Sequence, residues 1–177
     1  MVKSWIEAAI IFIVVLSIIG GFNGIQRMRL KVREGASGIE VALEKRYNLL
    51  IQMAKIAREY TGYEKQLHMD LVKVRKNQTL NENKKLEEEL GDAANELFAV
   101  AEGYPELKSS NNYLKLQEAI VESEDHLQAA RRLYNANVSE YNGMLVAFPS
   151  NLIAIIIGAR KAEYYHTDAD RYIDLPL

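Results

Sequence analysis

The sequence predicts an all-α chain, with a single N-terminal transmembrane helix followed by an antiparallel, up-and-down bundle of four helices. Three observations carry this prediction. A stretch of 19 uncharged residues lies near the N-terminus, apolar residues after it recur at spacings of three and four, and the 177 residues include only three prolines. Spacings of three and four place side chains on one face of a helix, whereas strand side chains alternate every second residue.

The uncharged stretch runs from residue 8 to residue 26, and its centre is rich in isoleucine and valine. At a rise of about 1.5 Å per residue, such a helix extends about 28 Å, close to the roughly 30 Å of a bilayer's hydrocarbon core. Trp5 lies just upstream of the stretch, and its indole favours the headgroup region. We therefore expect a membrane anchor that includes Trp5, Ala8, Phe12 and Ile19.

Four basic residues follow the stretch and predict its orientation. Arg27, Arg29, Lys31 and Arg33 resist translocation, and they also attract anionic lipid. We expect a single-pass protein of the cell membrane, with its N-terminus outside, its C-terminal domain in the cytoplasm and the lipid bilayer as a partner. One alternative is a cleaved secretory signal, since residues 20–24 also read as a poor cleavage site. The other alternative is a buried core helix.

Three apolar stripes after the anchor predict helices that each bury one face. They cover residues 32–57, 86–104 and 113–148, and the last is interrupted by polar side chains at only two positions. Ser109 or Ser110 is expected to cap the start of the last helix. Pro149 is expected to end it.

A shorter helix, with Leu67, Leu71 and Val74 on one face, completes the predicted four. Residues 77–83 then form its loop to the next helix. The competing arrangement has three long helices, with residues 63–103 as one continuous helix.

The predicted helices divide the chain into three parts. These are an N-terminal transmembrane helix at 1–26, a helical-bundle domain at 27–149, and a short apolar helix with a polar tail at 150–177. Residues 152–158 are too few to span a bilayer, and Ser150 with Asn151 is expected to cap their helix. From residue 159 onward we expect a loosely held tail.

The composition excludes several classes of function. Lys and Arg total 22 against 24 Asp and Glu, so a net charge of −2 provides no basic excess for nucleic-acid binding. There is no cysteine for a disulfide, a thiolate metal site or a nucleophile. The E-x-x-H pattern of di-iron bundles occurs once, at Glu163 and His166, without the partner motif that it needs. We therefore expect no enzyme, no catalytic residue, no metal, no cofactor and no small-molecule substrate.

Several motifs resemble the LemA family of small bacterial membrane proteins. Residues 97–108 read LFAVAEGYPELK and residues 113–118 read YLKLQE, close to the family's LFAVAEAYPDLKA and FLQLQEEL. Residues 45–50, KRYNLL, are similar to the start of RRYDLIPNLV, although Ile51-Gln52 replaces the Pro-Asn of that motif. The family pattern E…AR…YN…EYN is matched between residues 124 and 142, and FPGNLIA between residues 148 and 154. The resemblance covers roughly residues 25–165.

This resemblance implies one membrane span with a short external N-terminus and a four-helix bundle taken as cytoplasmic. It implies no catalytic activity, and it links relatives to membrane biogenesis and to membrane proteases. We expect a non-enzymatic adaptor or scaffold for membrane proteins, of which a membrane protease is one candidate. The alternative is a self-assembling structural protein that shapes or organises membrane.

Tyrosines are unusually frequent, with ten against four phenylalanines, and several fall on the predicted stripes, where a buried hydroxyl needs a hydrogen-bond partner. Arg46 lies inside a stripe as well, either snorkelling at its edge or as half of a buried pair. We expect a set of polar residues either to fix the register of the bundle as a structural layer or to line a groove for a partner. The set is Arg46, Tyr104, Glu124, Arg131, Tyr134, Tyr141 and Asn142. The expected partners of the tyrosines are Arg46, Glu124, Arg131 and Asn142.

Overall fold

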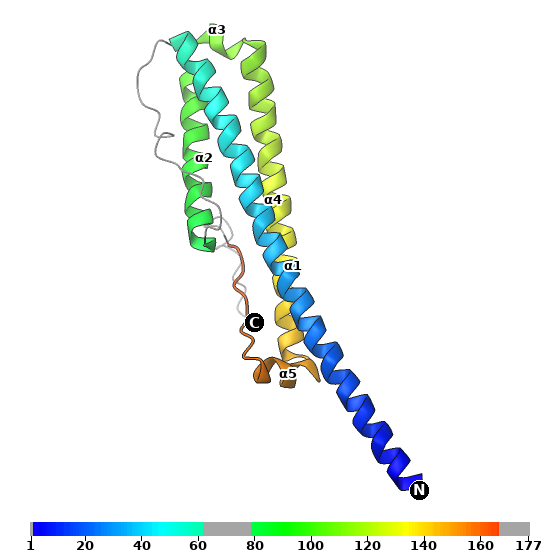
Figure 1. Cartoon of the computed structure of the whole chain (residues 1–177). Coiled ribbons are helices and arrows are strands. Elements are labelled where there is room, and N and C mark those ends of the chain that lie inside the picture. Colours follow the sequence, from blue (N-terminus) through cyan, green and yellow to red (C-terminus); the bar gives the residue numbers. More distant parts are fainter. Residues whose placement is uncertain (1, 62–78, 167–177) are drawn as a thin grey trace, which may run out of the picture. The chain divides into compact units, whose positions relative to one another are not determined.

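The computed structural model describes residues 2–61 and 79–166, and every regular element within them is a helix (Figure 1). The elements are α1 (Val2–Thr61), α2 (Leu80–Glu102), α3 (Pro105–Lys108), α4 (Asn111–Val146) and α5 (Ser150–Ile156). The predicted all-α class is confirmed. The predicted helix around Leu67 lies outside the described residues, so the bundle of four helices stays a prediction.

Local signals in the sequence explain where α2 begins and ends. Thr79 is extended and accepts the Glu82 N–H, while the Glu82 carboxylate accepts the Thr79 N–H, which makes a capping box. Because a helix starts afresh here, the alternative of one helix through 63–103 is wrong. The predicted loop over 77–83 is also wrong at its end, since residues 80–83 are helical. Gly103 caps the C-terminus of α2, and Pro105 begins α3 two residues later.

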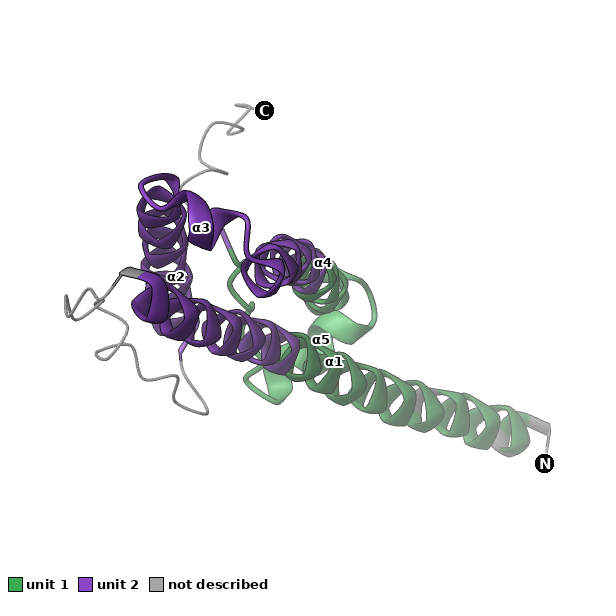
Figure 2. Ribbon diagram, turned by 90° about the horizontal axis from the view of Figure 1, so that it is seen from above, with its two compact units in different colours: residues 1–35, 133–165 green, residues 36–132, 166–177 purple. Residues whose placement is uncertain are grey.

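The residues form two compact units, and α1 and α4 each contribute to both (Figure 2). Unit 1 comprises residues 1–35 and 133–165, and unit 2 comprises residues 36–132 and 166–177. The predicted boundaries at residues 26 and 149 remain a prediction.

In unit 2, α1 and α2 run in the same direction, and α4 runs back against them (Figure 1). An up-and-down bundle of four requires this of its first, third and fourth helices. The apolar stripes are buried as the 3.6-residue period predicts. The buried side chains include Ile39, Leu43, Leu50, Met53, Leu86, Leu90, Leu97, Ile120 and Leu127.

In unit 1 the core is small and is built from three helices. Ile25 and Met28 of α1, Tyr141 of α4, and Ile153 and Ala154 of α5 are buried together. The last turn of the predicted α4 stripe differs from the expectation. Phe148, predicted to be buried, is 81% exposed, because α4 ends at Val146 and the chain turns there.

Two further expectations for the C-terminal region are corrected. Ser150 does not cap α5 with its side chain; instead its hydroxyl donates to the carbonyls of Met144 and Ala147. Residues 159–166 are not loosely held, since four side chains of α4 bind their backbone. Residues 167–177 lie outside the described part of the chain.

Two glycines of α1, Gly35 in unit 1 and Gly38 in unit 2, offer a matched test of how closely α1 packs against α4 at Gly35. A β-carbon at Gly35 would lie 3.0 Å from the Cα atom of Tyr134, whereas one at Gly38 would have no atom within 4 Å. We expect Gly35→Val to lower the free energy of unfolding by about 1–3 kcal/mol through overpacking. Gly38→Val should raise it by a few tenths of a kcal/mol through helix propensity. Chemical denaturation of the full chain in detergent, followed by circular dichroism, measures both, and equal effects would contradict the close approach.

Candidate functional site

Two asparagines on α4 bind the extended segment 159–166 through paired hydrogen bonds. The Asn142 side chain donates from Nδ2 to the Ala162 carbonyl at 3.0 Å and accepts the Ala162 N–H at 2.9 Å. Asn135 repeats this pairing with Tyr165, at 2.9 Å and 2.8 Å. Each amide side chain therefore pairs with one residue's backbone much as a neighbouring strand would.

The tyrosine before each asparagine extends the same contact. The Tyr134 hydroxyl donates to the Glu163 carbonyl at 2.9 Å, and the Tyr141 hydroxyl donates to the Arg160 carbonyl at 3.1 Å. The hydroxyls thus find backbone carbonyls, and the expectation that arginine, glutamate or Asn142 side chains would accept or donate these bonds is wrong. The partners lie 29 and 19 residues away along the chain.

The four residues Tyr134, Asn135, Tyr141 and Asn142, here called the Tyr-Asn ladder, match an extended chain by their spacing. Seven helical residues separate the two pairs, which corresponds to about 10.5 Å along α4. Their backbone targets are three residues apart, which corresponds to about 10 Å of extended chain. The repeats agree, so the hydrogen bonds of the ladder reach backbone atoms of the segment and not its side chains.

Tyr134 is held in its neutral form. Burial raises the pKa of its phenol above the ordinary value of 10, and the Glu163 carboxylate raises that pKa further. The Tyr165 ring packs edge-on against the Tyr134 ring, with ring centroids 6.4 Å apart. Because the folded pKa is raised, the associated stability is fully present below pH 10 and is lost as the pH rises through the folded value.

Unit 2 contains a second polar group, made of alternating charges. Arg46 of α1 lies 2.5 Å from a Glu124 oxygen of α4, and Arg131 lies 3.7 Å from the other Glu124 oxygen. Arg131 also pairs with Glu87 of α2. The side chains of Arg46 and Glu87 are only 11% and 10% exposed, so these charges are removed from most of the solvent. We call these four residues the ionic cluster.

The predicted polar set therefore separates into two places. Arg46, Glu124 and Arg131 belong to the ionic cluster, and Tyr134, Tyr141 and Asn142 belong to the Tyr-Asn ladder. Tyr104 joins neither, since it precedes α3 and is 37% exposed.

Sequence reasoning missed two members of these groups. Glu87 falls on the buried face of α2, at the helical spacing of Leu90 and Ala94, and that spacing was a usable signal. Asn135 follows Tyr134 as Asn142 follows Tyr141, so the heptad repeat of the Tyr-Asn pair was the signal there.

The N-terminal part of α1 places the predicted anchor residues on the surface. Trp5, Phe12 and Ile19 are 75%, 63% and 50% exposed. In the described part of the chain, α1 is the one helix long and apolar enough to cross a membrane. The basic residues after it are exposed too, and Lys31 lies 4.0 Å from Glu140.

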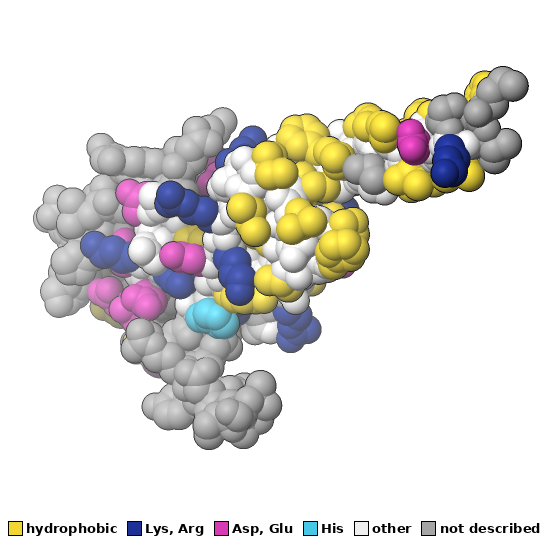
Figure 3. Space-filling view, turned by 90° about the horizontal axis from the view of Figure 1, so that it is seen from below, with side chains coloured by type: hydrophobic (Ala, Val, Ile, Leu, Met, Phe, Trp, Pro, Cys, Tyr) yellow, Lys and Arg dark blue, Asp and Glu magenta, His cyan; other side chains and the backbone are white. Residues whose placement is uncertain are grey.

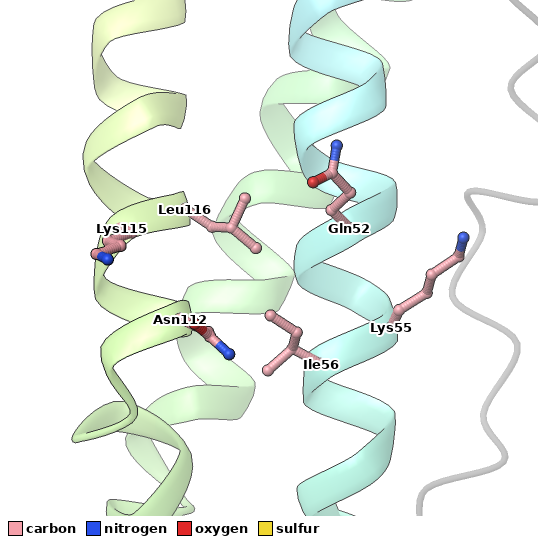
Figure 4. Close-up of a pocket in the computed structure, with 6 residues that line it drawn as sticks. All are labelled: Gln52, Lys55, Ile56, Asn112, Lys115 and Leu116. Carbon is pink, nitrogen blue, oxygen red and sulfur yellow. The ribbon is translucent and has the colours of Figure 1, made fainter.

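A shallow groove of about 400 Å³ lies between α1 and α4 in unit 2 (Figure 4). Ile56 and Leu116 point into it, while Lys55 and Lys115 point away (Figure 4). Its other lining residues are Gln52 and Asn112. None of the six is an acid, a histidine or a hydroxyl residue, and the described residues contain no group of three His, Asp or Glu placed to hold a metal ion.

Comparison with known proteins gives a family match and several relatives. The model of the LemA family matches residues 35–174. The magnetosome protein MamQ 2 of Paramagnetospirillum magneticum (strain AMB-1) is 39% identical over 75 residues, which cover 42% of this chain and 28% of that protein. Protein LemA of Metamycoplasma hominis is 26% identical over 141 residues, covering 77% of this chain and 64% of that protein. The match thus spans little more than a quarter of the magnetosome relative.

Substitution in the ionic cluster should be costly because it leaves a poorly solvated charge behind. We expect Arg46→Leu to lower the free energy of unfolding by about 2 kcal/mol, since Glu124 then keeps only the more distant Arg131. Lys45→Leu is the matched control, because Lys45 is 46% exposed and 4.0 Å from Glu122. It should change stability by less than about 0.5 kcal/mol. Denaturant titration of the full chain compares the two, and equal losses would contradict a special role for Arg46.

The Tyr-Asn ladder should control access to the C-terminal segment. We expect Asn142→Ala to speed tryptic cleavage after Arg160 and Lys161 by about tenfold, because two hydrogen bonds that hold the segment are lost. Asn137→Ala is the control on the same helix, since Asn137 donates to the Lys31 carbonyl instead. Mass spectrometry of timed digests follows each site. Unchanged cleavage in Asn142→Ala would show that the ladder does not hold the segment.

Proposed function

Because this chain belongs to the LemA family, whose model matches residues 35–174, we propose that it is a membrane-anchored adaptor or scaffold for membrane proteins. In this proposal the N-terminal part of α1 crosses the cell membrane once, with its N-terminus outside, and the rest of the chain binds partners in the cytoplasm. A membrane protease is one candidate partner.

The observation that carries the proposal is the exposed apolar stretch of α1, which continues without a break into two folded units. Its large side chains are mostly half-exposed or more, which is costly in water and favourable among lipid chains. Arg27, Arg29, Lys31 and Arg33 follow it at once, which supports a cytoplasmic position for the units.

The polar groups support binding rather than catalysis. The ladder side chains are engaged with the chain's own backbone, and the arginines of the ionic cluster are paired with glutamates. These contacts account for the groups as structural elements. We therefore propose that the protein is not an enzyme and uses neither cofactor nor metal.

Two exposed valines of unit 2 are the contact residues that we propose for a partner. Val41 of α1 is 63% exposed, and Val121 of α4 is 60% exposed. Apolar side chains left on helix faces suit contact with a helix of another protein.

The second candidate is a structural protein that self-assembles and organises membrane. The similarity to relatives that are named as magnetosome proteins supports this candidate. The same exposed valines would then contact a second copy.

Site-specific crosslinking in native membranes distinguishes the two candidates. We expect a photoreactive residue at Val121 to give a discrete adduct with one membrane protein, identified by mass spectrometry. The control is the same probe at His126, which is also exposed on α4 but lies about 140° around the helix from Val121. Adducts of two copies of this chain, with rings or filaments in lipid by electron microscopy, would favour self-assembly. No adduct above the control at Val121 or Val41 would contradict both.

The orientation has its own test. We expect green fluorescent protein fused after Leu177 to fluoresce, because it folds in the cytoplasm, and alkaline phosphatase at the same position to be inactive. Replacing Arg27, Arg29, Lys31 and Arg33 with glutamine should weaken this preference. An active phosphatase fusion in the unmodified chain would overturn the proposed orientation.

A further inference from the structure

The short helix α5 has two apolar faces, and only one of them is covered. Ile153 and Ala154 are buried against Ile25 and Met28 of α1. On the other side, Leu152, Ile155 and Ile156 are 53%, 76% and 83% exposed. Phe148, in the turn before the helix, adds an aromatic ring that is 81% exposed.

The polar atoms around this apolar face already have partners within the protein. The Ser150 hydroxyl donates to two carbonyls, and the Asn151 side chain accepts the Leu152 N–H. At the C-terminal end, the Gly158 N–H bonds to the Ile155 carbonyl and the Ala159 N–H to the Ala154 carbonyl, the pattern of a Schellman motif. Gly158 has a φ of 63°, which suits glycine. An apolar medium would therefore leave few of these backbone groups unsatisfied.

The contacts of α5 with α1 set its depth relative to the apolar stretch. A β-carbon at Gly21 would overlap the Ile153 side chain, and Ile25 packs in the same cluster. Both α1 residues lie inside the uncharged stretch, within about 8 Å of its end at residue 26. The stretch extends only about 28 Å, so nearly all of it is needed to cross a hydrocarbon core of roughly 30 Å. A helix packed on Gly21 and Ile25 then lies at the edge of that core.

Basic side chains surround this region. Arg27, Arg29, Arg160 and Lys161 are exposed in unit 1. Viewed from below, hydrophobic side chains gather on the face that carries α5, and Lys and Arg side chains lie at its border (Figure 3). This combination matches a bilayer boundary, where apolar side chains enter the acyl region and cations meet anionic headgroups.

We propose that α5 is a second membrane contact, lying in the interface of the bilayer that α1 crosses, with Phe148, Leu152, Ile155 and Ile156 among the lipid chains. With seven residues, about 10 Å, it is far too short to span the membrane. The proposal rests on the proposed membrane anchoring by α1. A lipid surface, rather than a second copy of this chain, is the occupant because the depth set by Gly21 and Ile25 already places α5 at the lipid boundary.

Fluorescence quenching by labelled lipids tests this directly. The chain has no cysteine, so single cysteines can carry a nitrobenzoxadiazole label in the full-length protein. The test position is Ile156→Cys. Ile13→Cys, in the apolar stretch and 61% exposed, reports on the anchor, and Val121→Cys, on α4 and 60% exposed, is the control of similar exposure in unit 2. Vesicles of phosphatidylcholine and phosphatidylglycerol carry a doxyl quencher at either a shallow or a deep acyl carbon.

The expected result is that the label at residue 156 is quenched by the shallow doxyl lipid about threefold more than the label at residue 121. The label at residue 13 should be quenched best by the deep one. In the labelled Ile156→Cys chain, Ile155→Glu should reduce the quenching toward the control level, while Val121→Glu should not. Both side chains are exposed in the fold, so unchanged helical circular dichroism is the check on folding.

Three results overturn the inference in distinguishable ways. If residue 13 is quenched while residue 156 behaves like residue 121, the anchor stands and the α5 contact is wrong. If residue 13 is not quenched either, the proposed anchoring fails and the α5 contact fails with it. The label at residue 156 could instead show a blue-shifted emission that no doxyl lipid quenches and that disappears when the protein is diluted with lipid. This result would assign the exposed face of α5 to contact with a second copy, and it would also overturn the inference.

Discussion

The pairing of asparagine side chains with backbone is the interaction on which unit 1 depends. The apolar cluster that holds α5 is small, with five buried residues, and α5 itself has only seven residues. A helix that short is not stable alone in water. It keeps its place because the chain on one side continues from α4 and the chain on the other side is bound to α4 by the Tyr-Asn ladder. Because the chain is held on both sides of α5, Ile153 and Ala154 pack against α1, and the opposite face of α5 stays exposed.

Unit 2 differs from unit 1 because its helices bury charged side chains within an otherwise apolar core. Desolvating Arg46, Glu87 and Arg131 costs free energy that their pairing only partly recovers. The alternation of charge across α1, α2 and α4 gives each charged side chain an opposite partner in one arrangement of the helices, and a shift by one turn would leave charges unpaired. The cluster therefore contributes more to the uniqueness of the packing than to its stability, in line with the use of buried polar groups to set helix register.

The two units bear differently on the proposed role. Unit 1 contains the apolar stretch, its basic flank and the free face of α5, which are all features that suit contact with lipid. Unit 2 contains exposed valines on helix faces that suit contact with protein. Family membership and these surfaces support the proposal of a protein that binds partners at a membrane. The choice between an adaptor and a self-assembling scaffold depends on what covers the faces of unit 2.

The sequence by itself determined the helical class, the apolar stretch, the ends of α2 and α4 to within a few residues, and the family. These follow from local physics: a 3.6-residue period, glycine and proline at helix ends, and uncharged length. Tertiary structure alone decided that residues 159–166 are held, that Tyr134 and Tyr141 donate to carbonyls, that Glu87 joins the charged pairs, and that Phe148 is exposed. The reason is physical. A backbone carbonyl is present at every residue, so the one that a distant hydroxyl will select leaves no mark in the sequence, and the choice is made only when the chain folds back on itself.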